Sequence, residues 1–186
     1  MKKSAYHLII GFFIIFSLIS VIITKEFTVT SNIQSIEESI EGFLSTKNIN
    51  GLINIHKVTD IDNKKLVVFE LNNNIGEAEF IRGINGKYKI LSTGYGTNFI
   101  RRRILKTNKA RYLTIIGRNY NKKIKRIDLV LENNNYTFSI PVEDEYFIYH
   151  KMITDDSMNM MLDKIILIDK QGNDITDKIY TKYKMR

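Results

Sequence analysis

Few residues in this chain have the type and spacing that catalysis or metal binding needs. Two of the three histidines, His56 and His150, lie in separate predicted strands, and neither has a second histidine at ligand spacing. A zinc site or a general base requires several groups that converge on one point. We therefore predict no metal ion, no cofactor and no catalytic residue, and we interpret both histidines as half-exposed strand residues.

Acidic residues cluster in predicted turns at Glu143–Glu145 and Asp155–Asp156. Paired carboxylates can perform acid–base chemistry or bind calcium. The segment Asp169–Asp174 has the polar composition of a calcium loop, but its glycine is in the fourth position and no glutamate follows as a bidentate ligand. We interpret this segment as a hairpin turn.

The densest charge in the sequence is positive. One basic run comprises Arg101, Arg102, Arg103, Lys106, Lys109 and Arg111, and a second one includes Lys122 and Lys123. Because strand residues alternate between faces, Arg101 and Arg103 should share one face. With a net charge of +8, these runs favour an anionic partner. We predict that they bind an anionic surface; the alternative is a solvated strand and hairpin.

An uncharged N-terminal run indicates where the charged elements lie relative to a membrane. Residues 5–24 contain no Asp, Glu, Lys or Arg and follow Lys2 and Lys3. A helix of about 20 apolar residues spans a hydrocarbon core of about 30 Å. We predict a transmembrane helix at 5–24, a cytoplasmic tail at 1–4 and a spacer at 25–30. The two lysines hold the N-terminus in the cytoplasm.

This topology predicts a single-pass signal-anchor protein of the cell membrane, with its C-terminal region extracytoplasmic in the cell envelope. A cleaved signal peptide is the alternative, but Ile22–Thr24 offers no pair of small residues for cleavage. The topology excludes nucleic acid as a partner. The absence of cysteine excludes disulfides, thiolate metal sites and a cysteine nucleophile.

The first region beyond the span, residues 31–92, predicts a helix packed on a four-stranded antiparallel meander. Apolar residues from Ile33 to Leu44 recur at helical spacing, which predicts a helix over Asn32–Thr46. Four strands with short polar breaks follow at Leu52–Val58, Lys65–Leu71, Gly76–Arg82 and Lys87–Ser92. Short turns force neighbouring strands to be antiparallel.

The second region, residues 99–186, predicts an immunoglobulin-like β-sandwich after a linker at 93–98. Evenly spaced strands are predicted at Phe99–Lys106, Arg111–Gly117, Ile124–Leu131, Tyr136–Val142, Glu145–Met152 and Leu162–Asp169, with a seventh near Ile175–Tyr180. The predicted fold class is therefore α+β with an all-β second half, preceded by an N-terminal transmembrane helix.

The order of these elements resembles that of uncharacterised single-span, membrane-anchored extracytoplasmic proteins of Gram-positive bacteria. Ile124–Tyr149 and Lys164–Ile175 carry the resemblance, as a strand, a polar turn, a strand ending near Pro141, an aromatic strand and a closing strand. The resemblance covers the second region well and the first only by architecture. It implies no activity and no catalytic residues.

Together these features predict an extracytoplasmic interaction or accessory module without catalytic activity. Its expected partners are the membrane through residues 5–24, an anionic wall polymer or lipid headgroups, and a membrane or envelope protein. The alternative is a hydrolase of wall polymer whose carboxylates meet only in the fold. Its candidate carboxylates are Asp60, Asp62, Glu143 and Asp155.

Overall fold

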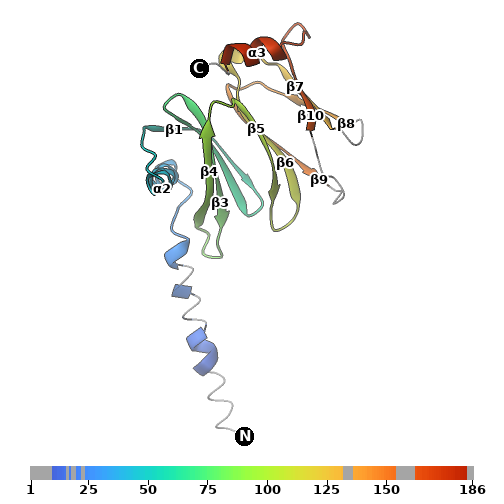
Figure 1. Cartoon of the computed structure of the whole chain (residues 1–186). Coiled ribbons are helices and arrows are strands. Elements are labelled where there is room, and N and C mark those ends of the chain that lie inside the picture. The colour runs from blue at the N-terminus through green and yellow to red at the C-terminus, as the bar shows by residue number, and fades with distance from the viewer. Residues whose placement is uncertain are drawn as a thin grey trace.

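A computed structural model describes residues 10–15, 17, 20–21, 24–131, 136–153 and 162–183 (Figure 1). The elements after residue 30 are α2 (Ile33–Ser45), β1 (Ile53–Ile61), β2 (Lys64–Leu71), β3 (Asn74–Arg82), β4 (Tyr88–Gly96), β5 (Ile100–Lys106), β6 (Arg111–Arg118), the 3-10 turn η1 (Tyr120–Lys122), β7 (Arg126–Leu131), β8 (Tyr136–Pro141), β9 (Tyr146–Ile153), β10 (Leu162–Ile168) and α3 (Thr176–Tyr183). The strands form three antiparallel sheets, in the orders β1-β2-β3-β4, β5-β6-β9 and β10-β7-β8.

Helix α2 covers the outer face of the first sheet. Its apolar residues Ile36, Ile40 and Leu44 recur at a spacing of four and are all buried. Such spacing places side chains on one face of a helix. The helix begins at Asn32, whose side-chain oxygen accepts a hydrogen bond of 2.7 Å from the backbone N–H of Ser35. The buried stripe packs on strand residues that include Phe69.

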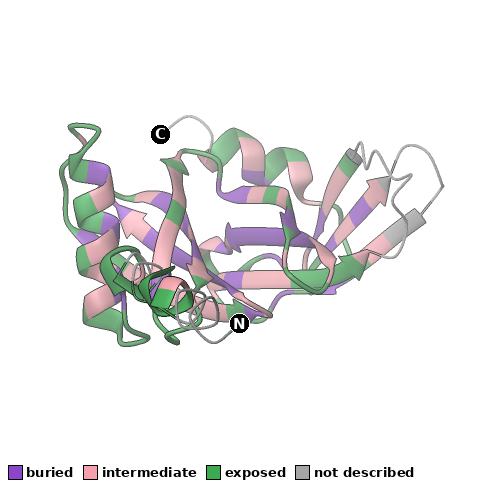
Figure 2. Ribbon diagram, turned by 90° about the horizontal axis from the view of Figure 1, so that it is seen from below, coloured by how far each residue is buried: buried purple, intermediate pink, exposed green. Residues whose placement is uncertain are grey.

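Strand β2 lies at the centre of the molecule and is buried on both faces, by α2 on one side and by the second sheet on the other. Val67 and Phe69 contact the α2 side, whereas Leu66 and Val68 contact the second sheet, together with Leu105 and other residues. An alternating strand becomes continuously apolar when both of its faces are covered. Figure 2 shows that the buried positions are concentrated in the strands at the centre of the molecule.

The second and third sheets pack face to face, and α3 closes one end of their core. The shared core includes Ile115 of β6, Leu129 of β7, Leu167 of β10 and Ile179 of α3. The molecule is therefore layered as helix, sheet, sheet and sheet, with η1 and α3 at the end of the molecule opposite the N-terminal segment (Figure 1). The division into domains at 31–92 and 99–186 stays a prediction.

The predicted fold class is wrong. The chain is mostly β, with three sheets, and its second half is two three-stranded sheets and a helix rather than an immunoglobulin-like sandwich. Residues 175–180, predicted as a seventh strand, contribute to α3. The oxygen Oδ1 of Asp174 accepts hydrogen bonds from both the backbone N–H and the hydroxyl of Thr176 at the start of this helix. These two local hydrogen bonds favour the start of a helix over the continuation of a strand. Ile179 of that helix is buried.

The predicted transmembrane helix is also corrected. Among the residues that the structure describes, no helix combines the length and the apolar character that crossing a bilayer requires. Parts of the predicted span, such as residues 5–9, lie outside the described residues. The prediction rested on hydropathy, which does not decide whether the backbone forms a long helix, and the run is rich in β-branched isoleucine, which lowers helix propensity.

The same finding overturns the predictions derived from that helix. These are the single-pass cell-membrane location, the signal-anchor and the extracytoplasmic cell-envelope assignment.

The segment between residue 24 and α2 contacts the edge strand β4 of the first sheet. The Glu26 carboxylate lies 2.8 Å from the Lys89 ammonium, and Val29 forms a bridge with Tyr88.

Candidate functional site

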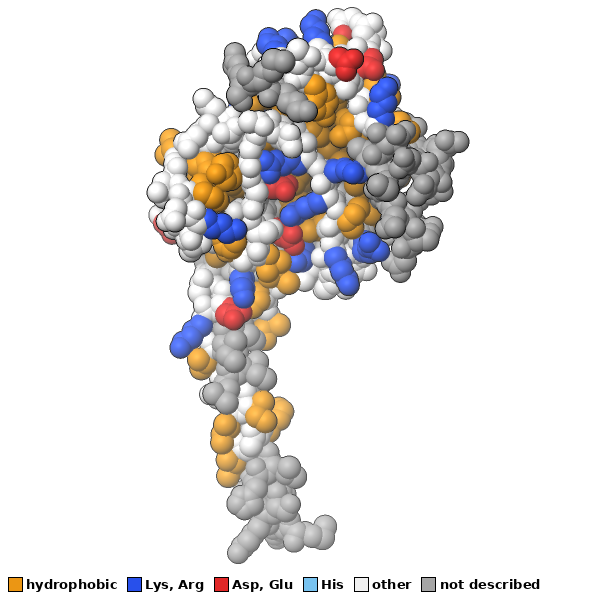
Figure 3. All heavy atoms as spheres, in the orientation of Figure 1, with side chains coloured by type: hydrophobic (Ala, Val, Ile, Leu, Met, Phe, Trp, Pro, Cys, Tyr) orange, Lys and Arg blue, Asp and Glu red, His pale blue; other side chains and the backbone are white. Residues whose placement is uncertain are grey.

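Four of the six residues of the first basic run lie on β5, beside the edge of the first sheet, and several charges of the run have acidic neighbours. Arg103 Nη2 lies 3.0 Å from a carboxylate oxygen of Glu79 on β3. Burial lowers the pKa of Arg101, and the nearby Glu77 opposes this shift. Figure 3 shows basic and acidic side chains alternating down the middle of the molecule, between β4 and β5. Arg101 and Arg103 therefore both face the first sheet. Their alternation along the strand predicts that they share a face.

The other members of this run are dispersed. Arg102 and Lys106 are exposed, and Arg111 is half-buried at the start of β6. Lys109 is exposed, and its ammonium lies 3.7 Å from the carboxylate of Asp62. The fold therefore does not gather these six residues into one basic site, and their role in binding stays a prediction.

The second basic run occupies a loop with an unusual backbone. Lys122 ends η1, and both Asn121 and Lys122 have positive φ angles, 55° and 51°. Residues other than glycine and asparagine rarely adopt this left-handed conformation, because it brings Cβ close to the following carbonyl oxygen. The loop therefore holds Lys122 in a backbone conformation that lysine disfavours, whereas Lys123 has right-handed helical angles.

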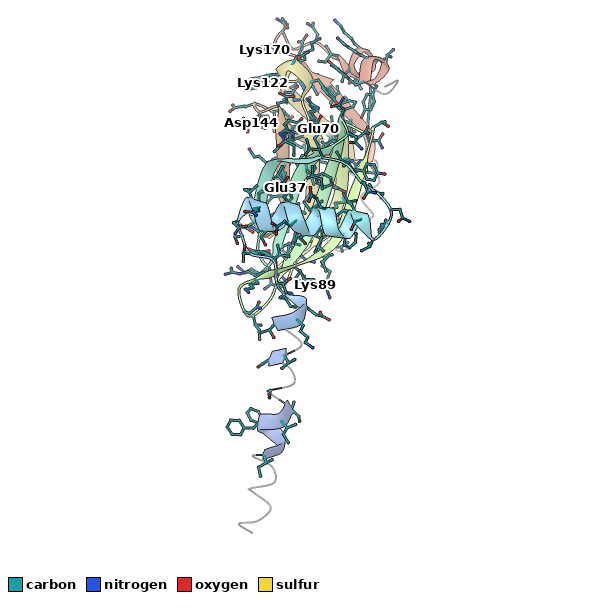
Figure 4. The ribbon with its side chains drawn as sticks, turned by 90° about the vertical axis from the view of Figure 1, so that its left-hand side faces the viewer. Glu37, Glu70, Lys89, Lys122, Asp144 and Lys170 are labelled. Carbon is teal, nitrogen blue, oxygen red and sulfur yellow. The ribbon has the colours of Figure 1, made fainter. Side chains whose placement is uncertain are left out.

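Three further lysines meet this loop in space. Lys170 follows β10, and Lys178 and Lys182 lie on α3; with Lys122 and Lys123 they line a pocket of about 350 Å³, which we call the lysine pocket. In Figure 4, Lys122 and Lys170 lie at the same end of the molecule, far from Lys89. The pocket also has apolar lining residues, of which Ile179 is buried.

The charge of the five pocket lysines is compensated only weakly among the described residues: Lys122 interacts electrostatically with Asp144, whose carboxylate pairs with Lys57 at 2.8 Å. All five are exposed, and within the described residues none of them forms an ion pair. The acidic residue of the pocket, Asp169, is engaged by its own loop, whose backbone N–H groups at Asn173 and Gln171 donate to it at 2.9 Å. Hydrogen bonds from Asn173 and its neighbours lower the pKa of Asp169, so its carboxylate stays ionised within that loop.

A polar cleft of about 670 Å³ adjoins the lysine pocket and shares Asn121 and Lys182 with it. Most of the other polar residues of this cleft are neutral hydrogen-bonding groups. They come from the β2–β3 turn and the start of β3, the segment after β4, η1 and the end of α3: Asn72, Asn73, Asn74, Thr97, Tyr120 and Tyr183. The two cavities are therefore adjacent, and we call them together the depression, with a basic part and an asparagine-rich part.

The charged side of the cleft is a network centred on Glu70. Oε2 of Glu70 accepts hydrogen bonds from the Tyr146 hydroxyl at 2.5 Å and from Arg118 Nη1 at 3.1 Å. Nε2 of His56 lies 3.3 Å from the same oxygen, but its alignment is too poor for a hydrogen bond, and it has no other such partner among the described residues. The imidazole of His56 stacks on the Tyr146 ring at 3.6 Å between centroids.

This network fixes the ionisation of its members. Burial alone would raise the pKa of Glu70, but Tyr146, Arg118 and His56 outweigh it and lower that pKa. Burial and the hydrogen bond to Glu70 raise the pKa of Tyr146. Arg118 also bonds Glu145, through Nε at 3.0 Å. Glu70 is thus an ionised structural partner of Arg118, unlike a general acid, whose pKa must be raised toward neutrality.

Of the carboxylates proposed for a hydrolase, Asp60 and Asp62 are engaged in other interactions, and none that the structure describes lines this depression. Asp60 lies 2.7 Å from the Lys65 ammonium, and Asp62 accepts a hydrogen bond of 2.6 Å from Thr107. Glu143 is exposed in the turn after β8, and Asp155 lies outside the described residues. No three His, Cys, Asp or Glu residues in the described part of the chain are arranged to hold a metal ion.

Sequence reasoning identified Lys122 and Lys123 but missed Lys170, Lys178 and Lys182. The available signal was the spacing of Lys178 and Lys182, which are four residues apart and therefore adjacent on a helix. That signal was lost because the segment was predicted to be a strand, in which two such residues lie about 13 Å apart.

Comparisons of the chain with protein-family models, with characterised proteins and with solved structures found no match.

Proposed function

We propose that this protein is a binding module for an anionic ligand that carries phosphate or carboxylate groups, and that the lysine pocket is its binding site. The carrying observation is that five exposed lysines from three separate segments converge on one pocket and form no ion pair with the residues that the structure describes. The role requires no catalytic residue. It keeps the anionic partner expected from the sequence and retains Lys122 and Lys123 of the predicted site, but not the run from Arg101 to Arg111.

Electrostatics favour this assignment over a solvated surface. Like charges four residues apart on a helix, such as Lys178 and Lys182, destabilise it by about 0.2–0.5 kcal/mol. A left-handed lysine such as Lys122 costs roughly a further 1–2 kcal/mol. Both features lower the stability of the free protein, and a bound anion offsets the first. Deviations of this kind from local structural rules concentrate at functional sites.

Calorimetric titration with tripolyphosphate tests the proposal. The site variant is Lys178→Gln/Lys182→Gln, which removes two charges from the pocket. At low ionic strength each exposed charge contributes up to about 1 kcal/mol at contact, so the dissociation constant should rise about tenfold or more. Because exposed charges are screened beyond about 8 Å at physiological salt, binding by the unchanged protein should weaken as salt rises.

The matched control is Lys87→Gln/Lys106→Gln, which removes the same charge from exposed positions outside the pocket. Its affinity for tripolyphosphate should stay within about twofold of the unchanged protein. Lys106 belongs to the first basic run, so the control also samples that run. Equal weakening in both variants would mean that tripolyphosphate responds only to net charge, and the proposal would fail. Absence of binding at low salt would have the same consequence.

A further inference from the structure

We propose that the ligand is a polyhydroxylated anion, namely a sugar or polyol that carries phosphate groups. Its anionic group would occupy the lysine pocket and its hydroxyl groups the adjoining asparagine-rich cleft. The inference rests on the proposed function, because it assigns the chemistry of the ligand at the same site.

The first argument is continuity. The two cavities share Asn121 and Lys182, so a ligand bound to the lysines extends directly into the cleft. The lysine pocket measures about 350 Å³ and the cleft about 670 Å³. Small-molecule sites commonly occupy about 300–1,000 Å³. The depression therefore has room for more than a bare phosphate.

The second argument is hydrogen-bond chemistry. Asn72, Asn73 and Asn74 line the cleft together with Asn121 and Thr97. An amide side chain offers both donors and acceptors, and a hydroxyl group does the same. A row of amides is therefore complementary to a row of hydroxyls, whereas a purely anionic ligand would use only the donors.

The third argument concerns the aromatic residues and disfavours a nucleotide. A nucleobase is commonly held by stacking on aromatic faces. Here Tyr120 and Tyr183 stack on each other, at 4.2 Å between centroids and 7° between planes. The Arg118 guanidinium lies a further 4.6 Å from the Tyr120 centroid. The stacked rings leave no slot between them for a base.

The fourth argument is that two of the asparagines are placed by the backbone and remain available to a ligand, whereas the amides of Asn72 and Asn74 donate to backbone carbonyls. Asn73 and Asn121 have φ angles of 65° and 55°, and both are exposed. Within the described residues, neither side chain forms a hydrogen bond. Turns at these positions require a residue that tolerates positive φ, and glycine would satisfy that requirement without an amide.

The test compares three probes of increasing complexity by calorimetry: inorganic phosphate, ribose 5-phosphate and uridine 5′-monophosphate. Two or three additional hydrogen bonds should make ribose 5-phosphate bind about tenfold more tightly than phosphate. The base of the mononucleotide should add less than about threefold. A mononucleotide that binds tenfold more tightly than ribose 5-phosphate would overturn the inference in favour of a nucleotide site.

The matched cleft variant is Asn72→Gly/Asn73→Gly, which keeps the β2–β3 turn and removes two amides that lie outside the lysine pocket. Its affinity for phosphate should stay within about twofold, while the advantage of ribose 5-phosphate should fall toward onefold. Thr97→Val is a second variant that removes only a hydroxyl, and it should lower the advantage partially. An unchanged advantage in both variants would overturn the assignment of the cleft.

The two proposals fail in distinguishable ways. Equal binding of phosphate and ribose 5-phosphate to the unchanged protein would overturn the polyhydroxylated ligand and leave the anion site intact. Absence of all binding would overturn both. A glycerol phosphate oligomer distinguishes a polymer from a free sugar phosphate: tighter binding of the oligomer than of glycerol 3-phosphate supports a polymer, and equal binding supports the free compound.

Discussion

The buried side chain of Asn119 joins Ile124 by two hydrogen bonds that close the loop carrying Lys122 and Lys123. Nδ2 of Asn119 donates to the carbonyl of Ile124 at 2.7 Å, and the backbone N–H of Ile124 donates back to Oδ1 at 2.8 Å. Asn119 is fully buried, and Ile124 is part of the core of the second half. One amide thus fixes both ends of the loop that presents two of the five lysines of the proposed site.

Asn119→Ala should destabilise the protein and disorganise the lysine pocket. The change leaves the backbone N–H and C=O of Ile124 buried without partners, and each such group costs about 1–3 kcal/mol. We expect the free energy of unfolding in urea to fall by about 2–4 kcal/mol. Asn98→Ala, at an exposed position, should change it by less than about 0.5 kcal/mol. An equal effect of the two changes would contradict the role of this amide.

Lys122→Gly should raise stability and lower affinity for anions. The φ angle of 51° is strained for lysine and free for glycine. We expect a gain of about 0.5–1 kcal/mol in the free energy of unfolding, since the flexibility of glycine in the unfolded chain offsets part of the relief. Tripolyphosphate should bind severalfold more weakly, which calorimetry can measure. A variant that is both more stable and equally tight in binding would remove Lys122 from the site.

Lys65 and Asp60 should show opposite tolerance to substitution. Lys65 is 3% exposed, and its ammonium lies 2.7 Å from Asp60 and 4.6 Å from the Tyr88 ring centroid. Asp60→Ala leaves the buried ammonium unpaired. Because the Asp60 side chain is 58% exposed, we expect a loss of about 1–2 kcal/mol, below the 3–5 kcal/mol of a fully buried pair.

Lys65→Met replaces the buried cation by an apolar chain of similar length and should cost less than about 1 kcal/mol. The double variant Asp60→Ala/Lys65→Met should be no less stable than Lys65→Met, since neither an unpaired ammonium nor an unpaired carboxylate remains at this position. Urea denaturation of the three variants at neutral pH checks the order. A larger loss from Lys65→Met than from Asp60→Ala would show that the lysine stem, rather than the pairing of its charge, dominates.

Local patterns in the sequence predicted much of the secondary structure. The helix predicted over Asn32–Thr46 is present as α2, because Ile36, Ile40 and Leu44 recur at helical spacing. Polar breaks located the turns on either side of β2. Alternation also placed Arg101 and Arg103 on one face of β5, although it could not indicate that this face meets Glu77 and Glu79.

Long-range features were not predictable, because they depend on how layers pack. Glu70 and Tyr146 are separated by 76 positions in the sequence and meet only because the first and second sheets stack. The lysine pocket draws on η1, the loop after β10 and α3, so no single window of sequence contains it. Hydropathy alone also predicted a membrane span, but the described residues contain no helix that is long and apolar enough to cross a bilayer.

Glu70 should make stability depend on pH in the acid range. Its pKa is lowered from the ordinary value of 4.5 by Tyr146, Arg118 and His56, which together outweigh its burial. A carboxylate with a lowered pKa stabilises the folded state at pH values above its ordinary pKa. It loses that contribution as the pH falls through its pKa in the folded protein.

The variant Glu70→Gln tests this contribution, because it removes the charge at every pH. The unchanged protein should therefore be more stable than the variant at pH 7, by about 1–3 kcal/mol for a half-buried pair with Arg118. This gap should narrow steadily as urea denaturation is repeated at pH 4.5 and pH 3. Other carboxylates titrate equally in both proteins and cancel in the difference. A gap that stays constant from pH 7 to pH 3 would mean that the size and polarity of the side chain, and not its charge, hold Arg118 and Tyr146 at the cleft.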